Sequence, residues 1–212
     1  MIITVFGATG QVGKRIVEQA LAQQHIVRAF GRNIDDFLDK ESHTPNLKAI
    51  KGYIFDAAEV LQAVQGADVV LSTLGGAFDG SDHARSLGIK NIVTQMETAH
   101  VKRIVALGGM GVLDDGKGDY LVNDKNYPAE YLPVGREHLQ AYLYLKDSNL
   151  DWTFVCSPDI LNEAVTGNYI TEGERVPSPN QGKIAAGDLA HFMLAEAVKN
   201  QYVQHRVGIS TK

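Results

Sequence analysis

The sequence predicts an α/β domain of the Rossmann type, with a doubly wound, mostly parallel sheet and helices on both faces. Short apolar runs rich in Val and Ile alternate with amphipathic segments, as in sheets whose strands are buried on both faces. A glycine-rich turn follows the first of these runs directly. The 212 residues suit one domain, so residues 1–212 are expected to share one core.

Each element follows from the alternation of these two patterns. Strands are expected near residues 2–6, 26–30, 48–51, 68–73, 102–107 and 152–156. Helices are expected near residues 11–24, 57–64, 84–99 and 134–148, with a weaker candidate near 33–41. A last helix is expected to run to Lys199, with Asp188 as its N-cap or its first-turn acid.

Two irregular stretches, 108–131 and 157–186, interrupt this rhythm. Both follow strands, and ligands of open α/β sheets bind at the carboxyl ends of the strands. We therefore expect the two stretches to form a small substrate-side region. Residues 109–131 carry several glycines and charges, and are expected to act as a mobile lid.

Composition excludes several classes of function. The net charge is −5 with no basic cluster, which argues against a nucleic-acid partner. The apolar runs are strand-sized, too short to cross a membrane, and the first reaches a glycine too soon for a signal peptide, so we expect a cytoplasmic protein. The histidines lack ligand spacing and no metal site is expected, while Cys156 is interpreted as a packing residue.

The strongest local signal is the turn Gly7-Ala8-Thr9-Gly10-Gln11-Val12-Gly13, between the first strand and the first helix. Gly7 would allow the tight turn, Gly10 the approach of a pyrophosphate, and Gly13 close packing of helix on strand. Free amides at the helix start would then face the phosphates. The pattern therefore predicts a dinucleotide site, with a merely structural glycine turn as the alternative.

A mononucleotide P-loop is the competing interpretation, because Gly13-Lys14 resembles its Gly-Lys pair. Arg15 stands where Ser or Thr would bind magnesium, and Ala8 replaces the earlier glycine. Both departures argue against P-loop chemistry.

The end of the second strand indicates which dinucleotide binds. NAD-preferring proteins place an acid there to bind the ribose 2′-hydroxyl, whereas this chain has Arg32-Asn33 and no acid before Asp35. Arg32 could bind a 2′-phosphate through paired hydrogen bonds. NADPH is therefore the expected cofactor, with NADH binding more weakly; the alternative for Arg32 is a solvated arginine at a helix start.

The Gly-x-x-Gly-x-x-Gly turn, Gly31-Arg32 and Asp56 resemble the atypical short-chain dehydrogenase/reductases that include NmrA-like proteins. Within that group the chain is most similar to the family of biliverdin reductase B, the NADPH-dependent flavin reductases. Further motifs carry this likeness over nearly the whole chain: Lys90-Asn91-Ile92-Val93, Thr166-Gly167-Asn168-Tyr169 and Asp188-Leu189-Ala190-His191-Phe192-Met193-Leu194.

The resemblance implies a set of cofactor contacts. The turn would hold the pyrophosphate, Arg32 the 2′-phosphate, and Asp56 would lie by the adenine. The path toward the nicotinamide would be lined by Leu74, Gly75, Gly76, Leu107, Gly108 and His138, and the nicotinamide would be bordered by Pro158, Asp159 and Ile160. Taken alone, His138 is more typical of a satisfied polar residue on a helix, and only the resemblance favours a contact.

Two departures bear on the chemistry. The family has a serine where this chain has Gly109 and a histidine where it has Asp159. Asp159 and His138 remain the candidate catalytic residues. Tyr142 and Lys146 spell the Tyr-x-x-x-Lys pair of the broader superfamily, but Lys146 lies at the far end of its helix. We therefore interpret Tyr142 as a packing residue and Lys146 as a terminal lysine that complements the helix dipole.

The leading hypothesis is an NADPH-dependent oxidoreductase that transfers hydride to a planar small molecule such as a flavin or a quinone. A non-catalytic NADP-binding sensor of the NmrA type is the alternative. A sugar-nucleotide epimerase or dehydratase is a weaker third alternative, because 212 residues leave little room for the substrate region of those enzymes.

Overall fold

The computed structural model describes residues 1–212 and contains every element that the sequence predicts. The strands are β1 Ile2–Phe6, β2 Ile26–Gly31, β3 Leu47–Lys51, β4 Val69–Ser72, β5 Arg103–Gly109, β6 Asp151–Ser157, β7 Asp159–Leu161, β8 Tyr169–Gly173, β9 Lys183–Ala185 and β10 His205–Thr211. The α-helices are α1 Gln11–Ala22, α2 Asp35–Glu41, α3 Ala57–Val64, α4 Ser86–Thr98, α5 Leu132–Lys146 and α6 Ala186–Lys199. Three short 3₁₀ turns are η1 Met110–Val112, η2 Leu121–Asn123 and η3 Ala129–Tyr131.

The main sheet has eight strands in the order β3-β2-β1-β4-β5-β6-β10-β8. All neighbours are parallel except β8, which runs antiparallel to β10. The predicted doubly wound, mostly parallel sheet is thereby confirmed. The strand order reverses between β1 and β4, and such a switch point is where open α/β sheets bind ligands.

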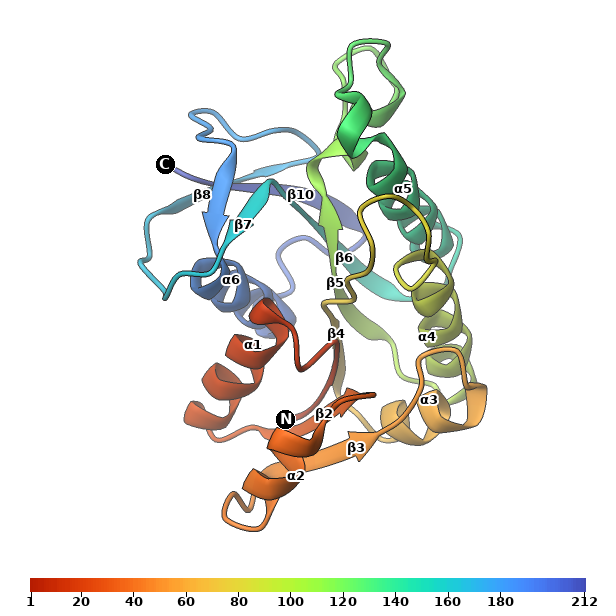
Figure 1. Cartoon of the computed structure of the whole chain (residues 1–212), viewed down its shortest axis with the longest axis vertical. Helices are drawn as coiled ribbons and strands as arrows, with labels where there is room; N and C mark the ends of the chain where they lie inside the picture. The colour runs from red at the N-terminus through yellow and green to blue at the C-terminus, as the bar shows by residue number, and fades with distance from the viewer.

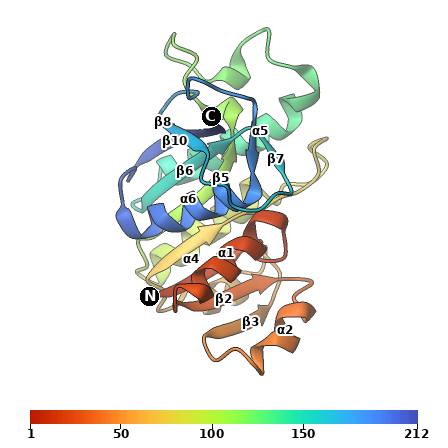
Figure 2. The ribbon, with the colours of Figure 1, turned by 90° about the vertical axis from the view of Figure 1, so that its left-hand side faces the viewer.

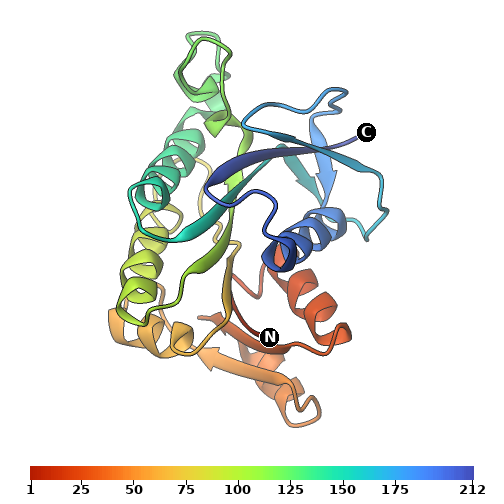
Figure 3. The same ribbon diagram turned by 180° about the vertical axis from the view of Figure 1, so that it is seen from behind.

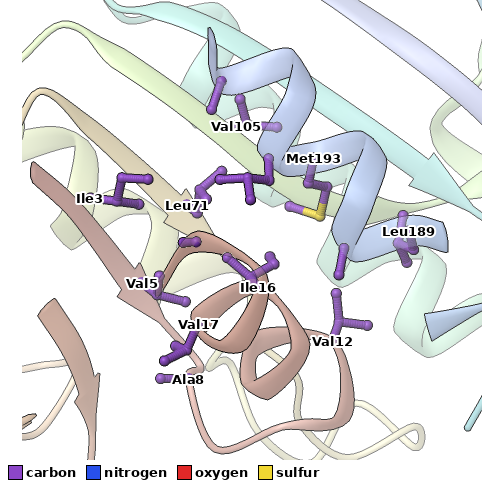
Figure 4. Close-up of a cluster of buried hydrophobic side chains, with 14 of the residues drawn as sticks. Ile3, Val5, Ala8, Val12, Ile16, Val17, Leu71, Val105, Leu189 and Met193 are labelled. Carbon is purple, nitrogen blue, oxygen red and sulfur yellow. The ribbon is translucent and has the colours of Figure 1, made fainter. Parts of the chain in front are cut away.

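Helices cover both faces of the sheet, with α1 and α6 on one side and α3, α4 and α5 on the other (Figures 1 and 3). Two separate apolar clusters fill the layers, one of 26 and one of 24 buried residues. In the first, Ile16 of α1 and Met193 of α6 pack over Leu71 and Val105 of the central strands (Figure 4). Strands with apolar side chains on both faces explain the continuous Val and Ile runs of the sequence.

The strands β7 to β10 were not predicted. β10 contains small residues, including Gly208, where a Cβ would collide with the carbonyl oxygen of Arg175. Its pattern therefore lacks the bulky run of the other strands, and tertiary packing selects its conformation. Asp188 is the first-turn acid of α6, whose N-cap is Ala185.

The stretch 108–131, which was expected to be irregular, contains the end of a strand and three short 3₁₀ turns. Gly108 and Gly109 end β5, and the three 3₁₀ turns follow. The Asp114 amide donates to Glu174 O over 2.9 Å, and Val122 is 3% exposed. The part that projects into solvent is the tip around Lys117.

None of the helices combines the length and the apolar character that a membrane crossing requires.

Candidate functional site

Most of the residues predicted to contact a cofactor lie on the turns that follow six adjacent parallel strands. Because neighbouring parallel strands end at one edge of a sheet, these turns follow one another in the order of the strands. From one end the edge carries Asp56 after β3, Arg32 after β2, the glycine turn after β1, Leu74–Gly76 after β4, Leu107–Gly109 in β5, and Pro158–Ile160 after β6. Figure 2 shows the start of α1, the loop after β4 and β7 on its right-hand side.

The glycine turn has the geometry that its sequence predicts. Gly7 adopts a φ of 76°, which an L side chain rarely adopts, and a Cβ there would lie 2.6 Å from Thr73 O. At Gly13 a Cβ would collide with the carbonyl oxygen of Gly7. Helix α1 therefore starts in close contact with the end of β1.

Thr73, which sequence reasoning missed, ties this turn to β4. Its Oγ1 donates toward Phe6 O at 3.1 Å and Gly7 O at 3.2 Å. The residue is 8% exposed and stands at the switch point between β1 and β4. A hydroxyl directly after an apolar strand was the available signal, but its target depends on the strand order.

The first turn of α1 is left open for an anion. Its N-cap is Gly10, no side chain caps it, and no acidic residue occupies its first turn. Helix amides without partners, together with the helix dipole, favour phosphate at such a position. The Gln11 side chain donates to Ile160 O over 3.4 Å, which places β7 beside this helix start.

Arg32 is exposed and makes no hydrogen bond or ion pair with the protein. The preceding Gly31 lies against the turn, since a Cβ there would be 3.8 Å from Thr9 Cγ2. The nearest acid in sequence, Asp35, pairs with Lys51 at 3.4 Å. The guanidinium is therefore free beside the phosphate turn, and the surface pair with Lys51 screens part of the charge of Asp35.

Asp56 already has a structural role. It is the N-cap of α3, and its carboxylate accepts a hydrogen bond from the Glu59 amide at 3.0 Å. Glu59 in turn accepts from the Tyr53 amide at 2.6 Å. Asp56 is exposed at the expected edge, with one oxygen engaged in capping.

Among the predicted site residues, His138 has the most strongly shifted pKa. Burial, and secondarily the charge of Arg85, lowers the pKa of His138 from 6.5 to about 3. Its Nδ1 is buried without a hydrogen-bond partner. The imidazole is therefore neutral at physiological pH, and we place its single proton on Nε2, where it can reach a ligand.

The departure at Gly109 is coupled to this histidine. A Cβ at Gly109 would lie 2.8 Å from Cδ2 of His138. The imidazole therefore packs where a serine side chain would begin, at the carboxyl end of β5. Gly109 and His138 form one unit, in which the glycine makes room for the ring.

The other predicted lining residues differ in how accessible they are. Gly108 is buried, because the Phe154 ring lies where its Cβ would be. Leu74 is half-buried against Gly88 of α4. Asp159 is exposed, and Pro158 and Ile160 are half-buried beside it.

A polar network that the sequence did not reveal surrounds the loop between β4 and α4. Glu137 Oε2 accepts from Ser86 Oγ at 2.7 Å, and Glu137 Oε1 lies 2.8 Å from His83 Nδ1. Arg85 is 7% exposed and donates to the backbone oxygens of Gly76 and Ala77. These contacts join the β4–α4 loop to the start of α5, next to His138.

Tyr142 and Cys156, which were interpreted as packing residues, are buried, and Lys146 is exposed at the end of α5. Tyr142 is 5% exposed, and burial raises its pKa to about 12, which suits a phenol that packs against Trp152 and Phe154. Burial also raises the pKa of the Cys156 thiol and outweighs the opposing charge of Arg206. Tyr142 is thus confirmed as part of the core. No group of three or more metal-binding side chains is present.

The fold and the glycine turn together define a Rossmann-type α/β protein, and its candidate dinucleotide site lies at the carboxyl edge of the sheet. The chain belongs to the NAD(P)H-binding family, which matches residues 7–200.

Individual relatives extend this likeness over the whole fold. A Burkholderia pseudomallei protein described as a candidate exported protein is 31% identical, with 99% of each chain covered and a TM-score of 0.84. A Streptococcus pneumoniae protein described as a candidate NADH-flavin reductase is 27% identical, with 100% of each chain covered and a TM-score of 0.83. Other similar structures are described as oxidoreductases, reductases or epimerases.

An uncharacterised chloroplast protein of Arabidopsis thaliana is 28% identical over 180 residues, 81% of this chain. The chain spans 64% of the length of that relative.

Proposed function

We propose that the protein is an NADPH-dependent reductase that transfers hydride to a planar small-molecule acceptor, a flavin or a quinone. The observation that carries the proposal is the uncapped start of α1 beside the free guanidinium of Arg32, which together suit a pyrophosphate and a 2′-phosphate. The buried, unpartnered Nδ1 of His138 fits a ring that is oriented to donate from Nε2 to a ligand. The residues present therefore fit the cofactor.

Bound at this edge, NADPH supplies the hydride and the protein aligns donor with acceptor. The turn and Arg32 hold the phosphate end, while the neutral His138 offers a hydrogen bond at the reactive end without adding charge. Hydride adds to N5 of an oxidised flavin, the ring delocalises the electron pair, and solvent supplies the remaining proton. No acidic side chain is needed for this acceptor.

The departures at Gly109 and Asp159 argue against a linear tetrapyrrole as substrate. Its reduction gains from a nearby proton donor, and general acid catalysis contributes about 10²–10⁴-fold. An exposed carboxylate such as Asp159 brings negative charge instead, which would repel propionate groups. We expect flavin or quinone reduction with poor reduction of biliverdin.

The test is the steady-state oxidation of NADPH with riboflavin, a benzoquinone and biliverdin, in wild type and in Asp159→His. The variant is expected to raise kcat/KM for biliverdin relative to riboflavin. Efficient biliverdin turnover by the wild type, or an unchanged ratio in the variant, contradicts this account of the site. The matched control is Asp36→His, an acid-to-histidine change on α2.

A non-catalytic NADP-binding sensor is the second candidate, and the placement of Tyr142 favours it. The tyrosine of the only Tyr-x-x-x-Lys pair is buried in the core and its lysine is exposed at the end of α5, so the pair does not form the usual proton-transfer site of the superfamily. Tight NADPH binding with no oxidation in the presence of any of the three acceptors would establish the sensor and reject the reductase.

A further inference from the structure

Phe78 is an aromatic side chain held in solvent at the edge of the sheet that carries the site. It is 65% exposed, more than any other large apolar residue of the chain. It lies in the loop between β4 and α4, which projects on the same side as the start of α1 and β7 (Figure 2). An exposed aromatic ring beside a ligand edge is a candidate contact surface.

The loop that carries Phe78 is braced by its own hydrogen bonds. Asp82 accepts from the amide of Ala77 at 2.7 Å and from that of Ala84 at 3.0 Å. Arg85 donates to Gly76 O and Ala77 O, both at 3.0 Å. These bonds fix the backbone on both sides of Phe78, so the structure of the loop itself holds the ring in solvent.

One face of the ring is already occupied. The guanidinium of Arg85 lies 5.7 Å from the ring centroid and is itself 7% exposed. A cation over one face draws π-electron density toward it, which leaves the ring better suited to stack on an electron-rich partner. Reduction of an isoalloxazine ring produces such a partner.

The same arginine connects Phe78 to the reactive end of the site. Ser86, next to Arg85, donates to Glu137, next to His138, over 2.7 Å. The His138 ring in turn packs on Gly109 at the end of β5. The loop also contacts the start of α5, since a Cβ at Gly80 would lie 3.1 Å from Cβ of Pro133. Phe78, Arg85 and His138 therefore belong to one connected group.

We propose that Phe78 is a stacking platform for the acceptor, and that Phe78 and Arg85 together select a planar aromatic ring that becomes anionic on reduction. This inference rests on the proposed function, since it identifies the acceptor's contact within the same site. In this reaction the hydride of NADPH would form the new N5–H bond of the flavin as the C4–H bond of the dihydronicotinamide breaks. The electron pair would pass with it and leave NADP⁺ and an anionic reduced flavin.

The test is the binding of riboflavin to the NADP⁺-loaded protein, measured by quenching of flavin fluorescence, because it needs no turnover. Phe78→Ala is expected to raise the Kd of riboflavin about twofold to tenfold, as for the loss of one aromatic pair. Phe78→Trp is expected to retain wild-type affinity. Leu38→Ala, an exposed apolar residue on α2, is the control, and the Kd of NADPH is expected to stay constant in all variants.

The outcomes separate this inference from the function on which it rests. Wild type that binds no riboflavin, or Phe78→Ala that binds it as well as wild type does, overturns the platform. A smaller particle size of Phe78→Ala in size-exclusion chromatography would also overturn it and assign Phe78 to a protein interface. Normal riboflavin binding without NADPH oxidation rejects the reductase and leaves the platform in place.

Discussion

At the scale of single residues, the proposed preference for NADPH over NADH depends on Arg32. It is free of protein partners, while Asp35 is paired with Lys51. Arg32→Ala is expected to weaken NADPH binding about 10- to 100-fold, because a charge-assisted hydrogen bond contributes about 1.5–3 kcal/mol. NADH binding should change little. Isothermal titration of both cofactors decides the matter, and equal affinities in the wild type would reject the role. Lys199→Ala, at the far end of α6, controls for general loss of positive charge.

His138 gives the second expectation at this scale, a dependence of stability on pH. Its folded pKa is about 3 and its ordinary value is 6.5, so below pH 6.5 the unfolded chain takes up a proton that the native protein does not. The contribution of His138 to the free energy of unfolding is therefore fully present above pH 6.5, and it is lost progressively as the pH drops toward 3. Denaturant unfolding at pH 7 and pH 5 should show a loss of roughly 1–2 kcal/mol.

The matched variant for this measurement is His138→Gln, which should lose most of that difference between pH 7 and pH 5. A variant with the same pH dependence as the wild type would show that other groups cause it. The kcat/KM for the acceptor should also show no titration between pH 6 and 7, since the imidazole stays neutral there.

At the scale of elements, the turn between β1 and α1 could be predicted because its chemistry is local. Three glycines in one turn, after an apolar run, specify both the backbone and the anion site. Thr73, Phe78 and the contact of His138 with Gly109 depend on which strands become neighbours, and spacing along one chain does not contain that information. The strands β7 to β10 were not predicted for a related reason, because tertiary packing and not local sequence determines their pairing.

The segment after β5 packs on helix α5, and a substitution at Gly135 tests this packing. Tyr127 and Val122 pack on Gly135 of α5, where a Cβ would lie 2.8 Å from Val122 Cγ2 and 3.1 Å from Tyr127 Oη. Gly135→Ala gains about 1 kcal/mol of helix propensity, but crowding costs about 1–3 kcal/mol. We expect net destabilisation and faster limited proteolysis of residues 113–131.

Gly88→Ala is the comparison for Gly135→Ala, because the added Cβ there would meet the end of the Leu74 side chain, away from residues 113–131. Cleavage of 113–131 at the wild-type rate in Gly135→Ala would contradict the packing. Whether NADPH also protects this segment, as a lid would require, stays a prediction that the same assay addresses.

At the scale of the whole molecule, a ligand at this edge contacts turns from both halves of the sheet and should stabilise the fold as a unit. NADPH at 100 times its Kd contributes about 2.7 kcal/mol, which raises the Tm of a domain of this size by roughly 5–10 °C. NADH at the same concentration should raise it less. Differential scanning calorimetry measures both, and a Tm that neither cofactor shifts would argue against the site.

The placement of β10 between β6 and β8 constrains the order in which the strands can pair during synthesis. Strand β8 pairs only with β10, and α6 is synthesised between them. On the ribosome, the strands that carry the nucleotide turns can therefore assemble while β8 still lacks its partner. Strand β8 can join the sheet only after β10 has been synthesised, so this antiparallel edge forms after the six parallel strands that carry the proposed cofactor turns.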